Sequence, residues 1–95
     1  MIVRIAADGG VSLHEAADCK KLHVEAVDAG RAGAALEAAG AGRPLDAEHV
    51  LLDVDWLAHE SAGIADPDAF AGMLAYAGSK GWTTIDGKAV RAHIA

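Results

Sequence analysis

The sequence predicts a small α/β domain, a two-layer sandwich in which helices cover one face of a mixed sheet. Several short segments alternate apolar and polar residues, as a strand with one buried face does. Other segments carry helix-capping residues, and abundant alanine and glycine let helices approach a sheet closely. A ferredoxin-like α+β arrangement is the alternative. With 95 residues, the chain forms one domain over 1–95 that needs no disulfide or metal to fold.

The chain begins with a predicted strand, Ile2 to Ala6, which ends in a tight turn at Asp8-Gly9-Gly10. The next segment has two interpretations. Val11 to His14 can return as a hairpin partner, because Asp-Gly is a strong turn signal. Alternatively, Ser12 and Glu15 have capping-box spacing and can open a short helix through Lys20. We favour the helix because alanines and a basic end suit it.

The next elements are a strand, a helix and a loop. Leu22 to Val27 alternates and predicts a strand with one polar face. Asp28 is suited to cap a helix over Ala29 to Ala39, which Gly40 ends. Ala41 to Pro44 is expected to be a loop.

The stretch from Val50 to Glu60 is predicted to be the central strand, because β-branched and aromatic residues are enriched there. In that interpretation Leu52, Val54, Trp56 and Ala58 face the core and Asp53, Asp55, Leu57 and His59 face outward. The alternative is an amphipathic helix that begins at Asp46 and ends near Gly63.

The clearest helix signal is Asp66 followed by Pro67, a capping residue before a first-turn proline. Apolar residues at helical spacing continue this helix to Lys80, and Gly81-Trp82 is typical of a capping turn. A hairpin through Asp86-Gly87 then leads to a final strand, Lys88 to Ile94, with Arg91 and His93 facing outward.

The composition excludes several partners. A formal net charge of −6 argues against a nucleic-acid backbone as ligand, because such binding depends on clustered Lys and Arg. No run approaches the ~20 apolar residues of a membrane span. The single Cys19 and the lack of a signal-peptide pattern favour a cytoplasmic protein.

Most of the side chains that could act in catalysis or ligand binding lie on the outer faces of the predicted strands. Asp55 and His59 are the candidate catalytic pair, because a carboxylate can orient a histidine for proton transfer. The candidate ligand-binding residues are His23, Asp53, Arg91 and His93. No standard metal-ligand spacing occurs, so no metal site is predicted, and no cofactor is assigned.

The sequence contains no recognisable catalytic motif and has little room for a large pocket. It therefore predicts a small cytoplasmic binding or accessory module without catalysis of its own. An uncovered sheet face with Leu57 and Val27 at its centre would favour a homo-oligomer. The alternative is a small acid/base or metal-assisted enzyme that acts on a polar or anionic small molecule at the open sheet face.

Overall fold

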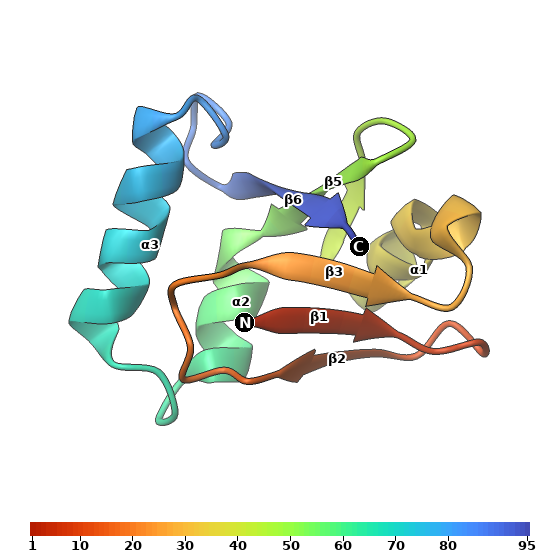
Figure 1. Cartoon of the computed structure of the whole chain (residues 1–95), viewed down its shortest axis with the longest axis horizontal. Coiled ribbons are helices and arrows are strands. Elements are labelled where there is room, and N and C mark those ends of the chain that lie inside the picture. Colours follow the sequence, from red (N-terminus) through yellow and green to blue (C-terminus); the bar gives the residue numbers. More distant parts are fainter.

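A computed structural model describes residues 1–95 and shows an α+β fold, with one mixed six-stranded sheet and three α-helices (Figure 1). The strands are β1 (Ile2–Ile5), β2 (Val11–His14), β3 (His23–Ala26), β4 (Gly42–Pro44), β5 (His49–Asp53) and β6 (Ala89–Ile94). The helices are α1 (Ala32–Ala39), which follows a 3-10 turn η1 (Ala29–Arg31), α2 (Val54–Ser61) and α3 (Pro67–Ser79).

The strand order is β2-β1-β3-β6-β5-β4. The pairs β1 with β3 and β3 with β6 are parallel, and the other neighbours are antiparallel. The mixed sheet with its helices agrees with the prediction in part, because the class is α+β and the two-layer sandwich is not confirmed. The element order differs from the β-α-β-β-α-β order of a ferredoxin-like fold, so that alternative is not confirmed.

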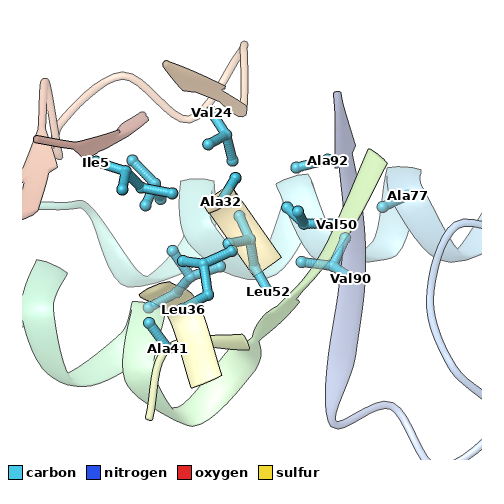
Figure 2. Packing of buried hydrophobic residues seen from close by; sticks show 12 residues of the cluster. Ile5, Val24, Ala32, Leu36, Ala41, Val50, Leu52, Ala77, Val90 and Ala92 are labelled. Atoms are coloured by element: carbon cyan, nitrogen blue, oxygen red, sulfur yellow. The ribbon is translucent and has the colours of Figure 1, made fainter. Parts of the chain in front are cut away.

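One cluster of 12 buried residues forms the core. The sheet contributes alternating side chains such as Val3, Val24 and Leu52, whereas α1 contributes Leu36 and α2 contributes Leu57 (Figure 2 shows the packing of this cluster). Each such side chain stabilises the fold by roughly 1.5–3 kcal/mol when fully buried. The residues between them on each strand point to the opposite face of the sheet, where the polar groups gather.

The helix predicted from Ser12 to Lys20 is wrong, because Val11–His14 form β2 and pair antiparallel with β1. The hairpin turn depends on Gly9, whose φ of 89° is a conformation that glycine adopts readily. The Gly9 N–H donates to the Ala6 carbonyl, and the Ala6 N–H donates to the Gly10 carbonyl. Glu15, the expected capping partner, has a φ of 50° and lies outside any helix.

The central stretch is a strand only as far as Asp53, so the predicted strand Val50 to Glu60 is wrong in its second half. The Asp53 carboxylate accepts a hydrogen bond from the Trp56 backbone N–H at 2.8 Å and thereby caps α2. Leu57 consequently lies fully buried in the core and not on the outer face of the sheet. The predicted loop before this stretch contains the short strand β4.

The remaining predicted elements are confirmed, except that the helix expected from Ala29 begins at Ala32, after the 3-10 turn η1 that Asp28 caps. Strand β3 lies within Leu22 to Val27, and Gly40 ends α1 in the left-handed conformation. Asp66 caps α3 by accepting a hydrogen bond from the Ala69 N–H at 3.0 Å. Beyond Gly81, the Trp82 N–H donates back to the Ala77 carbonyl as a capping turn requires.

On the side away from β5, strand β6 has two different partners along its length. The candidate site lies where one partner gives way to the other. The C-terminal part of β6 pairs with β3 over only two residue pairs, of which His23 with His93 is the first. Its N-terminal part instead pairs with the chain that follows α3, where Thr83 bridges Val90 and the Arg91 N–H donates to the Trp82 carbonyl. Figure 1 shows β3 and β6 separating toward α3.

Candidate ligand-binding site

A pocket of about 260 Å³ lies at this junction, between β6, the start of β3 and helix α3. Its apolar lining includes Leu22, Met73, Ala77, Val90 and Ala92. Ligand sites of this kind combine an apolar lining with a few polar groups that orient the ligand. The volume is slightly below the usual ~300–1,000 Å³, so the pocket suits a small molecule.

The polar lining of the pocket is cationic. Arg91 and Lys20 contribute permanent positive charges, and His49 and His93 contribute two imidazoles. Neither Arg91 nor Lys20 forms an ion pair with a carboxylate, although the chain has 14 Asp and Glu residues. The pocket therefore holds two uncompensated cations in an acidic protein.

Aromatic side chains fix the position of the Arg91 guanidinium. Its Cζ lies 5.5 Å from the centre of the Trp82 ring, within cation–π range. The Trp82 ring packs edge-on against Tyr76 of α3, with 6.0 Å between the ring centroids. These contacts hold the guanidinium beside the pocket without neutralising its charge.

Three histidines lie in one row across neighbouring strands. In the sheet register, His93 of β6 is opposite His23 of β3 on one side and His49 of β5 on the other. The rings of His49 and His93 are 5.5 Å apart and nearly perpendicular. No group of three or more His, Cys, Asp or Glu side chains is arranged to hold a metal ion.

Carboxylates orient two of these histidines. The Asp46 Oδ1 atom lies 2.9 Å from His49 Nδ1, and the Glu25 Oε2 atom lies 3.2 Å from His23 Nε2. Hydrogen bonds from the Glu48 backbone and from His49 lower the pKa of Asp46, and hydrogen bonds from His23 and Arg4 lower the pKa of Glu25. His93 has no carboxylate partner.

Of the predicted ligand-binding residues, His23, Arg91 and His93 lie together on one face of β3 and β6. Asp53 does not join them, because it lies at the far end of the β5–β6 ladder and caps α2. The predicted catalytic pair, Asp55 and His59, lies exposed on α2 and not on a strand.

Sequence reasoning missed His49, Lys20 and the role of Trp82 as a pocket residue. Extending the alternation of β5 by one residue upstream would have placed His49 on the same face as Asp53. Lys20 and Trp82 lie outside the named strands and helices, so no periodic pattern could have indicated them.

A second, wider hollow of about 470 Å³ lies on the same face near Arg4, Ser12 and His14. Its charge is largely compensated, because the Arg4 Nε atom bonds to Glu25 at 3.1 Å. The Ser12 Oγ atom lies 2.9 Å from His14 Nε2, but no carboxylate hydrogen-bonds to that histidine. The pocket beside Arg91 is thus the better candidate for ligand binding.

No protein-family model matches the chain, and no curated protein or solved structure is significantly similar to it. None of its helices has the length and apolar character needed to cross a membrane.

Proposed function

We propose that this protein is a small binding module, without catalysis of its own, that takes up a small organic anion in the pocket beside Arg91. The observation that carries the proposal is that two cations without an ion pair, Arg91 and Lys20, line one pocket together with apolar side chains. An anionic head group would gain charge-assisted hydrogen bonds there. The apolar body of the ligand would cover Leu22, Met73 and Val90.

In this proposed function the molecule is a two-layer sandwich in the cytoplasm, and the ligand binds between the edge of β6 and helix α3. This function does not include acid/base catalysis by Asp55 and His59. Both side chains are exposed on α2, and neither forms a side-chain hydrogen bond.

The first test is an NMR titration of the ¹⁵N-labelled protein with benzoate, an anion with a small flat apolar body. The side-chain N–H signals of Trp82 and Arg91 should shift and saturate together. Arg91→Gln should weaken binding by about five- to tenfold, because it removes one charge-assisted contact at a partly exposed site. Benzyl alcohol, which has no charge, should bind much more weakly.

Arg43→Gln is the matched control. Arg43 lies on the same sheet face, separated from Arg91 by Leu51, and does not line the pocket. This variant should bind benzoate as the wild type does, and so should the double variant Asp55→Ala with His59→Ala. Equal losses in Arg91→Gln and Arg43→Gln would show that only the overall charge matters and would reject the pocket.

Self-association is the second part of the proposal. Strands β2 and β4 lie at the two edges of the sheet, and an edge strand offers unpaired backbone groups to another chain. Leu57 no longer supports an interface because it is buried, whereas Val27 just beyond β3 is 74% exposed. Native mass spectrometry should show a dimer, and a monomer at micromolar concentration would contradict this part alone.

A further inference from the structure

The two histidines of the pocket differ in what already surrounds them. The imidazole of His49 bonds to Asp46 at 2.9 Å, so it has a negative partner before any ligand arrives. His93 is exposed and has no such partner. A positive charge on His93 is therefore the one that a bound anion would stabilise most.

The charged groups around His93 come from every element that lines the pocket. On β6 itself the neighbour is Arg91, from β3 it is His23, and from β5 it is His49. Lys20 precedes β3, and α3 contributes Tyr76 and the nearby Lys80. The carboxylates of this neighbourhood, Asp46 and Glu25, bond to His49 and His23 and not to His93. Arg91 and Lys20 are the positive groups of the lining that have no carboxylate partner.

We propose that the pocket binds a small monocarboxylate together with a proton, which His93 takes up. This proposal rests on the proposed function, because it assigns the ligand class and the pH control of the same site. The incoming carboxylate supplies the negative charge that the pocket lining lacks and gives the protonated His93 imidazole an opposite charge beside it. Binding and protonation consequently reinforce each other, as linkage requires.

A single carboxylate suits the pocket better than a phosphate. A compact, fully hydrated anion would leave the apolar lining residues Leu22, Met73, Ala77 and Val90 uncovered. A carboxylate leaves an organic body to cover that lining, and its planar shape matches a guanidinium. Inorganic phosphate should therefore bind more weakly than benzoate.

The experiment is calorimetric titration with benzoate at about pH 7 in two buffers of different ionisation enthalpy, followed by affinities at about pH 5.5 and about pH 7.5. Benzoate binding should be accompanied by the uptake of a few tenths of a proton at neutral pH, because the His93 imidazole gains a carboxylate neighbour. The affinity should be about two- to fivefold higher at the lower pH.

His93→Asn should remove both the proton uptake and the pH dependence while retaining binding to Arg91. His59→Asn, on α2 and outside the pocket, should leave both unchanged. His49→Asn should retain most of the proton uptake. If His49→Asn abolishes the uptake and His93→Asn does not, the assignment to His93 is overturned.

The failures of the two proposals are distinguishable. Saturable benzoate binding with equal affinity at both pH values and no proton uptake overturns the coupling but leaves the binding module intact. Absence of saturable binding at either pH overturns both. Binding of phosphate as tight as that of benzoate overturns the monocarboxylate as ligand class.

Discussion

Gly33 and Gly72 are both helical glycines, but their surroundings are opposite. A Cβ atom on Gly33 would lie 2.4 Å from the Cβ and 2.9 Å from the Cα of Pro44, closer than real atoms approach. The absence of a side chain thus lets α1 lie directly against β4. At Gly72 of α3 an added Cβ atom would meet nothing within 4 Å.

The pair gives two predictions of opposite sign. Gly33→Ala should lower the free energy of unfolding by about 1–3 kcal/mol, because β4 or α1 must shift. Gly72→Ala should raise it by about 0.5–1 kcal/mol, because alanine restricts the unfolded chain and suits a helix interior. Urea denaturation of both variants checks this, and destabilisation of similar size in both would contradict the contact with Pro44.

At the scale of elements, the sequence predicts those whose signals are local. The capping residues Asp66 and Gly40 mark helix ends correctly, because each acts on backbone groups only a few residues away. The stretch around Asp53 fails as a single strand because that residue both ends β5 and caps α2. When a short strand and a short helix share one run of apolar residues, the spacing of those residues does not show where the strand ends and the helix begins.

Strand β2 illustrates the complementary limit. The local capping-box spacing of Ser12 and Glu15 favours a helix, but pairing with β1 forms a hairpin, which partly buries Val11 and Leu13. The candidate site depends on pairing in the same way. His23, His93 and His49 become neighbours only through the register of β3, β6 and β5. Periodicity predicts the outward faces of strands but not which strands are adjacent.

At the scale of the whole molecule, exposed carboxylates couple stability to pH. The pKa of Glu25 is lowered from 4.5 by hydrogen bonds from His23 and Arg4. The pKa of Asp86 is lowered from 3.8 chiefly by the Thr84 hydroxyl, and that of Asp46 is lowered from 3.8 as well. Between the lowered pKa values of the folded chain and the ordinary values of the unfolded chain, the unfolded chain binds more protons. The free energy of unfolding therefore rises with pH in that range.

We therefore expect the contribution of these carboxylates to be complete above about pH 5 and to disappear as the pH falls through their lowered pKa values. Glu25→Gln should reduce the slope of the free energy of unfolding against pH in this acidic range. Added salt should also reduce that slope, because the charged groups are solvent-accessible. Glu37→Gln, at an exposed residue of α1 without an ion pair, is the control. Urea midpoints between about pH 3 and pH 6 test this, and an unchanged slope in Glu25→Gln would contradict it.

The short β3–β6 ladder has a consequence for how the chain folds. It is the only strand pairing that joins β2-β1-β3, formed within the first 26 residues, to β4-β5-β6, formed from residue 42 onward. Its two residue pairs bring together positions about 70 residues apart in the chain, and closing so long a loop has a high entropic cost. The two halves of the sheet should thus assemble separately and join last, along the line where the pocket forms.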